Sequence, residues 1–495
     1  GRVMRLAPDK KYGYIILPVA IPADTPPEQA LSSSRFNVIW QVLQALRAHD
    51  ERFNAMINQI DLNKAPGERL EVIFPDYPTD NPDETGKSTE TRQYTQGMLD
   101  LPTVAQWRDA IYAKIVAKVG SRRYWEDWAE DIRDIAEAHI TRIRAILDNP
   151  TPELEQKFNA FLTGLRRNLN ESISRDDAIE MLSQHLITKP VFDALFEGYD
   201  FTEHNPVSLT MQAMVDALED QNLDTETQTL EAFYESVRVR AEGIDNAAGK
   251  QKIITELYES FFKKAFPKTA ESLGIVYTPV PVVDFIIRSV ETLLQREFGA
   301  SISDEGVHVL DPFTGTGTFI VRLLESGLIR REDLLRKYTQ ELHANEILLL
   351  AYYIAAINIE ATFHGLLKEH DPNAGYVPFN GIVLTDTFQM TEADDTIDAI
   401  IFPTNNARAE AQKALDIRVI IGNPPYSVGQ SSGNDNNPNL KYPTLDRRIE
   451  DTYAARSTAT NKNSLYDSYI RAIRWASDRI GNEGIIGYVT NGGWI

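Results

Sequence analysis

Short apolar segments alternate with helical ones along the second half of the chain, and this alternation constrains the fold more than any other feature. Three runs have the length and apolar content of buried strands: VHVLD (307–311), VIIGN (419–423) and GIIGYV (484–489). Two stretches, 281–298 and 345–361, carry apolar residues at helical spacing or are nearly apolar throughout. We therefore predict an α/β domain with a parallel, doubly wound sheet over residues 269–495.

The region before this domain has a different pattern. Residues 36–57 and 124–147 carry apolar residues at helical spacing over long stretches, which predicts an all-helical domain over residues 23–268. Between them, the segment 75–93 is rich in proline and charge and is predicted to be an exposed loop. Residues 1–22 contain one β-rich run, YGYIILPV, and are interpreted as the end of a further module.

Composition excludes several classes of protein. The net charge of −22 argues against a nonspecific nucleic-acid coat but leaves room for a local basic channel. The chain has no cysteine, which excludes disulfides and thiolate metal sites and is compatible with a reducing cytoplasm. Its eight histidines form no ligand-spaced pair, so no metal is predicted. No apolar run reaches the roughly 18 residues of a membrane span.

A glycine-containing loop follows the first predicted strand. Residues 311–319 read DPFTGTGTF, and Gly315 and Gly317 would let the backbone approach a ligand at the start of the next helix. A phosphate-binding P-loop would need a lysine that is absent here. A dinucleotide loop would need a third glycine, which this segment lacks.

A second unusual segment, IGNPPYS, runs from Ile421 to Ser427 and follows another predicted strand. Two adjacent prolines fix two φ angles and remove two N–H donors, so the sheet cannot continue through them. The residues around them are held in one pose at the carboxyl end of a strand, where open α/β sheets bind ligands. A plain strand-ending turn is the alternative.

These two segments, in this order, resemble the cofactor loop and the N-P-P-Y motif of γ-type amino-methyltransferases, which methylate adenine N6 in DNA. GIVYTP (274–279) is similar to the family's cofactor-capping segment, and GIVLTDTF (381–388) supplies an Asp where the family binds the cofactor's adenine. The resemblance implies a Rossmann-like S-adenosylmethionine-dependent fold. It implies these cofactor-binding residues: Tyr277, Thr278, Pro279, Asp311, Pro312, Phe313, Thr314, Gly315, Gly317, Thr318, Phe319, Glu346 and Asp386.

The family's acidic ribose ligand ends its second strand, and two glutamates compete for that role in QELHANEI (340–347). We favour Glu346 over Glu341, because the helix containing Asn358 then follows at the distance usual in the family. The losing glutamate would be a solvated residue near the strand.

The amino-terminal segment GRVMR, followed by a strand, resembles the last motif of a superfamily 2 helicase. A helicase end, a helical connector and a γ-type methyltransferase in this order resemble the bacterial, cytoplasmic type ISP single-polypeptide restriction–modification enzymes. The resemblance implies a helicase end at 1–22, a coupler at 23–268 and a methyltransferase domain at 269–495. It further implies double-stranded DNA with a flipped adenine as partner. A nuclease, an ATP-driven motor and a target-recognition domain would lie elsewhere in the parent chain, with ATP used only by the motor.

The resemblance also implies how the site would act. Asn423, Pro424, Pro425 and Tyr426 form the catalytic motif, in which the Asn423 and Pro424 carbonyls accept the hydrogens of the adenine amine and Tyr426 stacks on the flipped base. Two other functions stay open: a non-catalytic coupling segment that binds cofactor, and an amino-methyltransferase for RNA or protein. The polar stretch 428–466 is expected to be a long loop that contacts phosphates or a solvated insertion.

Overall fold

The computed structural model describes residues 39, 42–43, 124–195, 204–219, 278–368, 371, 374–392, 400–425 and 441–490. The chain divides into two compact units, residues 1–122 with 242–249 and residues 123–241 with 250–495. Nearly all described residues belong to the second unit. The predictions for the helicase end at 1–22, the helix at 36–57 and the loop at 75–93 fall outside the described residues, apart from three isolated positions.

The described residues of this unit contain a five-stranded sheet of order β3-β2-β1-β4-β5 in which every neighbouring pair is parallel. The strands are β1 (His308–Asp311), β2 (Leu342–Glu346), β3 (Ile382–Leu384), β4 (Ile417–Gly422) and β5 (Ile485–Tyr488). β1 lies between β2 and β4, with Asp311 opposite Ala344 and Leu310 opposite Ile420. The predicted parallel, doubly wound α/β fold is confirmed.

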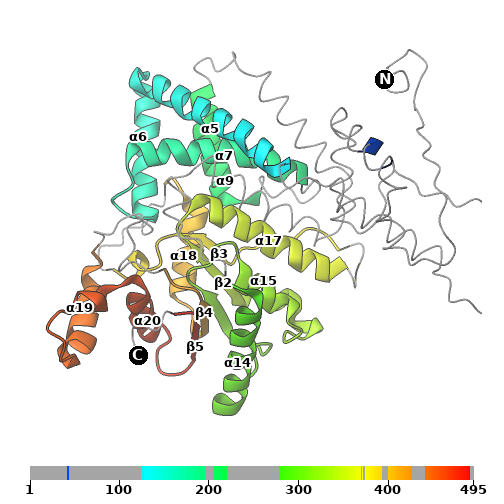
Figure 1. Ribbon diagram of the computed structural model, residues 1–495, viewed down its shortest axis with the longest axis vertical. Coiled ribbons are helices and arrows are strands. Elements are labelled where there is room, and N and C mark those ends of the chain that lie inside the picture. Colours follow the sequence, from blue (N-terminus) through cyan, green and yellow to red (C-terminus); the bar gives the residue numbers. More distant parts are fainter. Residues whose placement is uncertain are drawn as a thin grey trace, which may run out of the picture. The chain divides into compact units, whose positions relative to one another are not determined.

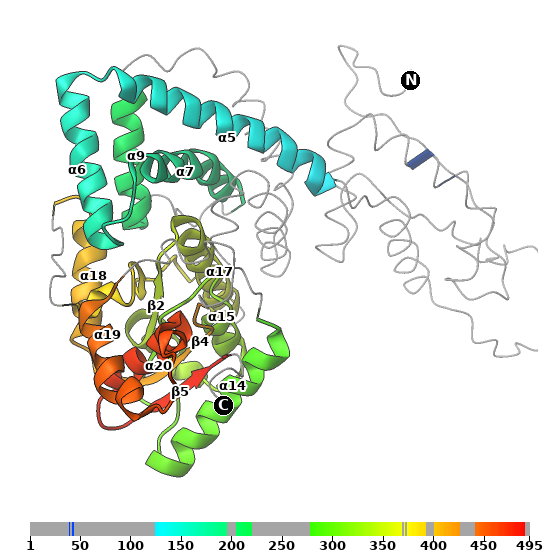
Figure 2. The ribbon, with the colours of Figure 1, turned by 60° about the vertical axis from the view of Figure 1, so that its left-hand side comes forward.

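Helices cover both faces of the sheet, as Figures 1 and 2 show. On one face lie α14 (Val280–Phe298), α15 (Thr318–Glu325) and α17 (Leu349–Lys368), which contact one another in that order. On the other face lie α18 (Pro403–Lys413), α19 (Pro443–Ile449) and α20 (Ser468–Arg479). Short helical turns complete the described part: Arg331–Asp333, α16 (Leu334–Arg336), Lys337–Glu341, Gln389–Thr391, Glu450–Ala454 and Asn463–Tyr466.

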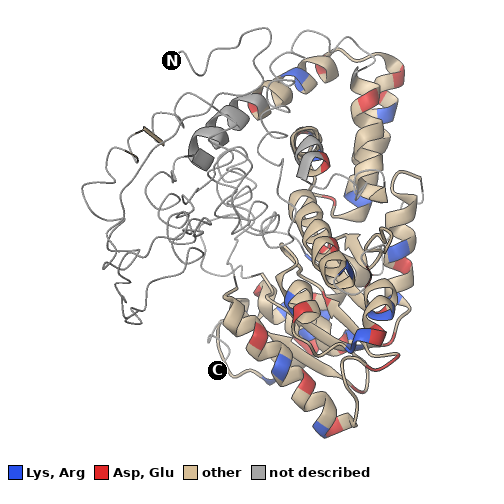
Figure 3. Cartoon of the chain, turned by 90° about the vertical axis from the view of Figure 1, so that its right-hand side faces the viewer, with Lys and Arg blue, Asp and Glu red and all other residues tan. Residues whose placement is uncertain are grey.

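Local sequence explains where several helices begin and end. α14 starts just after Pro279 and stops at Gly299, whose φ of +62° is the left-handed conformation that glycine adopts without strain. The side chain of Asp467 accepts the Tyr469 amide and so caps the start of α20. Charged residues of both signs are scattered along the helices (Figure 3).

Four helices precede the sheet in the same unit: α5 (Tyr124–Asp148), α6 (Pro152–Asn168), α7 (Arg175–Leu195) and α9 (Pro206–Glu219). α6 begins with Thr151, whose hydroxyl accepts the Leu154 amide, followed by Pro152 in the first turn. α7 and α9 contact α17 and α18 of the α/β domain. These helices confirm the all-helical prediction for the part of 23–268 that is described.

The contact between α7, α9 and α17 is polar as well as apolar. His185 Nδ1 lies 3.0 Å from the Tyr353 hydroxyl, and Asn205 Nδ2 donates to the Tyr352 hydroxyl at 3.2 Å. Burial lowers the pKa of His185 to about 4, so this imidazole is neutral at pH 7. Such a buried network specifies one arrangement of the helices, because an unpaired group there would be costly.

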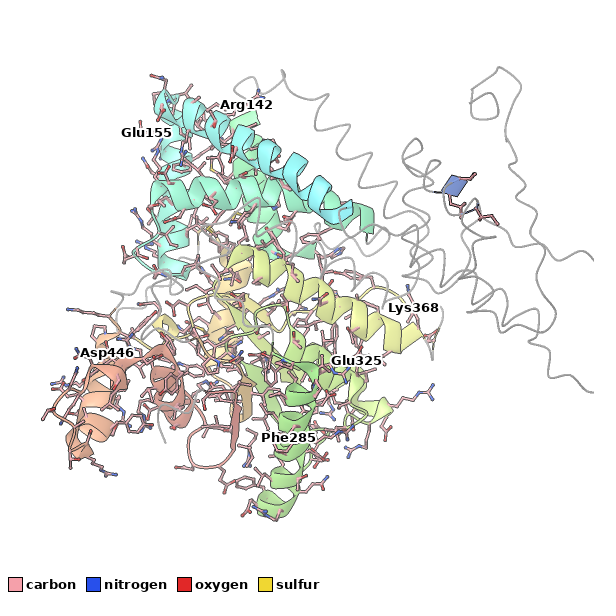
Figure 4. The ribbon with its side chains drawn as sticks, viewed as in Figure 1. Arg142, Glu155, Phe285, Glu325, Lys368 and Asp446 are labelled. Atoms are coloured by element: carbon pink, nitrogen blue, oxygen red, sulfur yellow. The ribbon has the colours of Figure 1, made fainter. Side chains whose placement is uncertain are left out.

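The prediction of a loop over 428–466 is wrong for its described part. Residues 443–449 form α19, and Tyr442, Leu445 and Ile449 are buried at helical spacing. Leu445 belongs to the apolar cluster that includes Trp475 of α20. Arg471 of α20 pairs with Asp446 of α19 at 2.8 Å, and Asp446 is labelled in Figure 4. The apolar spacing stabilises a helix despite the polar composition of the stretch.

Candidate active site

The direction of the chain across the sheet reverses between β1 and β4, and both predicted motifs lie there. Crossings after β1 lead to β2 and β3 on one side, whereas β4 and β5 lie on the other. The carboxyl ends of strands at such a switch point border a crevice that binds ligands. A Cβ on Gly422 would come within 2.7 Å of Asp311 Oδ1, so the two strand ends are in direct contact.

The loop after β1 is held by hydrogen bonds to β2. The Thr314 amide donates to the Asn345 carbonyl at 3.0 Å, and the Gly315 amide donates to Glu346 Oε2 at 2.7 Å. Gly315 and Gly317 have φ of +56° and +85°, as the prediction of a tight glycine loop requires. Gly317 immediately precedes α15, whose first N–H groups face the loop without intrahelical acceptors.

The two glutamates compared above lie at opposite ends of β2. Glu346 ends the strand beside the loop, is buried, and accepts the Leu348 amide at 2.9 Å on its other oxygen. Glu341 precedes the strand, pairs with Lys337 at 2.8 Å and with Arg336, and accepts the Gly306 amide. Glu341 is therefore a buried member of a structural ion pair, and the expectation of a solvated side chain was wrong. Of the two glutamates, only Glu346 borders the crevice.

Two carboxylates of the crevice have raised pKa values. Burial raises the pKa of Asp311 to about 8, and nearby Glu346 adds to this shift. Burial also raises the pKa of Glu346 to about 7. Asp311 Oδ1 accepts the Phe313 amide at 3.2 Å, but its Oδ2 is buried with no hydrogen-bond partner among the described residues. A buried carboxyl oxygen without a hydrogen-bond partner is costly unless a ligand supplies one.

Asp386 lies two residues after β3 and is buried. Its Oδ1 accepts the amides of Phe388 and Gln389 at 2.9 and 3.3 Å. Its Oδ2 accepts the Tyr442 hydroxyl at 2.9 Å. Thr387, the next residue, donates its hydroxyl to the Pro312 carbonyl at 2.6 Å and so ties the Asp386 segment to the loop after β1.

Asn423 follows β4 directly and is joined to the segment before α14. Its side-chain Nδ2 donates to the Thr278 hydroxyl oxygen at 3.0 Å. Thr278 and Pro424 are buried, whereas Asn423 and Pro425 are half-buried. Tyr277 and Tyr426, both predicted site residues, lie outside the described residues.

The aromatic residues of the loop pack into the protein. The Phe313 ring centroid lies 5.3 Å from that of Phe388 and 6.2 Å from that of Tyr488. Phe319 is buried on α15, and Thr318 is half-buried with its hydroxyl 3.3 Å from that of Thr316. Phe319 can therefore offer a ligand its backbone N–H but not its ring.

Two residues of this region, Tyr442 and Thr387, were not predicted from the sequence, and Asn358 was used there only to place its helix. Tyr442 contacts Asp386, Thr387 contacts Pro312, and Asn358 Nδ2 donates to the Thr316 carbonyl at 2.9 Å. Asn358 carried a signal, because it is a polar residue within a nearly apolar helix. Tyr442 carried none, because it lies in a polar stretch far from Asp386 in sequence.

The crevice suits an organic ligand rich in hydroxyl and amine donors. Asp311, Glu346 and Asp386 present carboxylate oxygens at the ends of three adjacent strands, while the glycine loop presents backbone N–H groups. Among the described residues no group of three or more His, Asp or Glu side chains has the geometry of a metal site. Within the same residues no helix is long and apolar enough to cross a bilayer.

A doubly wound domain with a glycine loop after β1, acidic residues at the carboxyl ends of β2 and β3, and Asn-Pro-Pro after β4 defines the class of amino-methyltransferases. Comparison with protein families agrees. Residues 249–456 match the N-6 DNA Methylase family, and residues 124–249 match the coupler domain of the Type ISP restriction-modification enzymes. The chain belongs to the type ISP restriction–modification family and carries its coupler and N-6 methylase domains.

Solved structures similar to this chain include two Type ISP restriction-modification enzymes. The structure titled "ATP-dependent Type ISP restriction-modification enzyme LlaBIII bound to DNA" is 48% identical, with a TM-score of 0.84, and the match covers 100% of this chain and 32% of that one. A nuclease-deletion mutant of the Type ISP enzyme LlaGI in complex with a DNA substrate mimic is 45% identical, with a TM-score of 0.80, over 98% of this chain and 35% of that one. The chain thus spans about a third of the length of these relatives. No curated protein matches it.

Proposed function

We propose that this chain transfers a methyl group from S-adenosylmethionine to adenine N6 in double-stranded DNA, as the modification part of a restriction–modification enzyme. The observation that carries the proposal is the meeting of the glycine loop and Asn-Pro-Pro at the switch point of an N-6 methylase fold. The DNA-bound state of two similar enzymes supports DNA as the partner.

The cofactor would lie across the carboxyl ends of β1, β2 and β3. Glu346 would accept the ribose hydroxyls and Asp386 the adenine amine. The loop from Asp311 to Phe319 would face the methionine end, together with Tyr277 and Pro279. The residues fit such a ligand, because Asp311 Oδ2 is buried without a hydrogen-bond partner among the described residues and the buried Glu346 carboxyl lies beside the same loop.

When bound, the cofactor supplies an electrophilic methyl group on a sulfonium. The adenine amine is a poor nucleophile, because its lone pair is delocalised into the ring. Asn423 Oδ1 and the Pro424 carbonyl would each accept one N6 hydrogen, which favours tetrahedral geometry and localises the lone pair. Pro424 and Pro425 hold these acceptors in place, so the stabilisation is preorganised.

The target adenine must leave the duplex to reach this site, and Tyr426 would stack on the flipped base. A motor, a nuclease and a target-recognition domain, with ATP used by the motor, are proposed for the parent enzyme. The exposed Lys441 and Arg447 on the segment after Asn-Pro-Pro are available for phosphate contacts, whereas Arg448 pairs with Asp478 at 2.8 Å.

Calorimetry and methyl transfer test the two halves of the proposal. The chain should bind S-adenosylmethionine, and Asp386→Ala should weaken binding by about 1.5–3 kcal/mol, the range for hydrogen bonds to charged groups. In the parent enzyme, single-turnover transfer of a tritiated methyl group to duplex DNA should fall about 10²–10³-fold in Asn423→Ala. Well-folded protein that binds no cofactor, or transfer that is undiminished in Asn423→Ala, would contradict the respective half. Transfer to RNA or protein in preference to DNA would replace the substrate.

A further inference from the structure

We propose that Thr278 is a positioning residue for Asn423, holding its side-chain amide in the orientation that methyl transfer requires. The inference rests on the proposed function, and it gives Thr278 a task different from the cofactor contact expected from sequence. It is carried by the hydrogen bond from Asn423 Nδ2 to the Thr278 hydroxyl oxygen, at 3.0 Å, across 145 residues of sequence.

Both ends of this contact are fixed by neighbouring backbone. Thr278 precedes Pro279, whose carbonyl accepts the amides of Val282 and Val283 at 2.8 and 3.2 Å at the start of α14. A β-branched side chain is stiff about χ1, and Thr278 is only 8% exposed. Asn423 stands between β4 and two prolines, which fix its backbone from the other side.

The orientation matters because the two ends of an amide are alike in size and opposite in chemistry. With Nδ2 directed at Thr278, Oδ1 is the end directed away from it. A half-turn would exchange the carbonyl for an NH₂ group. The adenine amine brings hydrogens to the site, so it would then meet a donor instead of an acceptor. With its nitrogen bound to Thr278, Asn423 is held in the orientation that leaves Oδ1 for the adenine amine.

Thr278→Val keeps the shape of the side chain and removes the hydroxyl. The single-turnover rate of the parent enzyme is expected to fall by about tenfold, the kinetic equivalent of one net hydrogen bond. The dissociation constant for S-adenosylmethionine should change by less than about twofold, because in this assignment Thr278 acts on Asn423 and not on the cofactor. Thr278→Ser, which keeps the hydroxyl, should restore most of the rate. Thr292→Val, on the exposed side of α14, is the matched control.

A double-mutant cycle separates positioning from a general structural effect. In the Asn423→Ala background, Thr278→Val should cause no further loss of rate, because the group it orients is gone. An equal loss in both backgrounds would overturn the proposal. The proposal would also be overturned if Thr278→Val weakened cofactor binding and left the rate unchanged. The same holds if Thr278→Val and Thr278→Ser lowered the melting temperature and the rate equally. A wild-type enzyme that methylates no adenine would instead overturn the proposed function, and this inference with it.

Discussion

The two loop glycines should fail in different ways when each is replaced by alanine, although both have a positive φ. A Cβ on Gly315 would meet nothing within 4 Å in the described part of the chain, and this open space adjoins the loop that we propose binds the cofactor. A Cβ on Gly317 would lie 3.2 Å from Cα and from the carbonyl oxygen of Ala355, on α17. Backbone atoms of a buried helix cannot move aside as a flexible side chain would.

The magnitudes follow from these surroundings. Gly315→Ala incurs only the left-handed penalty, about 1–2 kcal/mol of folding stability. Gly317→Ala incurs the same penalty plus overpacking against α17, about 1–3 kcal/mol more. For ligand binding the order should reverse. Gly315→Ala should weaken S-adenosylmethionine binding by about tenfold or more, since a 1.4 kcal/mol steric cost already has that effect.

Denaturant midpoints and calorimetric titration of the same proteins measure the two effects. Gly327→Ala serves as the control, because Gly327 has φ of +74°, open space around its Cβ and a position outside the site. It should match Gly315→Ala in stability and the wild type in affinity. A Gly317→Ala protein no less stable than Gly327→Ala, or a Gly315→Ala protein that binds the cofactor as the wild type does, would contradict this prediction.

Three further outcomes are expected. Tyr442→Phe should cost about 1.5–3 kcal/mol of stability in denaturant unfolding, because it removes a donor to the buried Asp386 carboxylate. Tyr453→Phe, at a half-buried tyrosine of the turn Glu450–Ala454, should cost much less. Since the folded pKa of Glu346 is raised to about 7, its contribution to stability is present below its unfolded pKa of about 4.3 and is lost as pH rises towards 7. Glu346→Gln should flatten that decline in a series of unfolding midpoints. The pH dependence from His185 has the opposite sign, because its folded pKa is lowered to about 4. Its contribution to stability is present above its unfolded pKa of about 6.5 and is lost as pH falls through 4. His185→Gln should remove this loss of stability in acid.

The fold was predictable because two central strands, β1 and β4, are buried on both faces. Val309, Leu310, Val419 and Ile420 are fully buried, so each strand is a continuous apolar run that polar residues end. Parallel strands place their carboxyl ends at one edge, and this alone brings the segments around Asp311, Glu346, Asp386 and Asn423 together. The helix at 443–449 was missed, because three apolar positions within a polar stretch give too short a periodic signal.

The hydrogen-bond partners within the site were not predictable. Tyr442 reaches Asp386 across 56 residues, and Thr278 reaches Asn423 across 145. Each pairing depends on how a loop leaves its strand, and periodicity carries no information about that geometry. The burial of Glu341 was also beyond sequence reasoning, because its stabilising partner Lys337 is an ordinary surface residue type until its helical turn is placed.

The composition of α17 shows why the coupler and the methylase share one compact unit. A helix that covers a sheet normally keeps a polar face towards water, yet residues 349–364 of α17 are buried all around. On one side Ala355 and Asn358 contact the loop residues Gly317 and Thr316. On the other side Tyr352 and Tyr353 bond to Asn205 of the segment before α9 and to His185 of α7. Without the coupler helices, two buried tyrosines and their apolar neighbours would face water directly behind the cofactor loop. The coupler therefore completes the core of the methylase domain, and the loop is only one helix away from it.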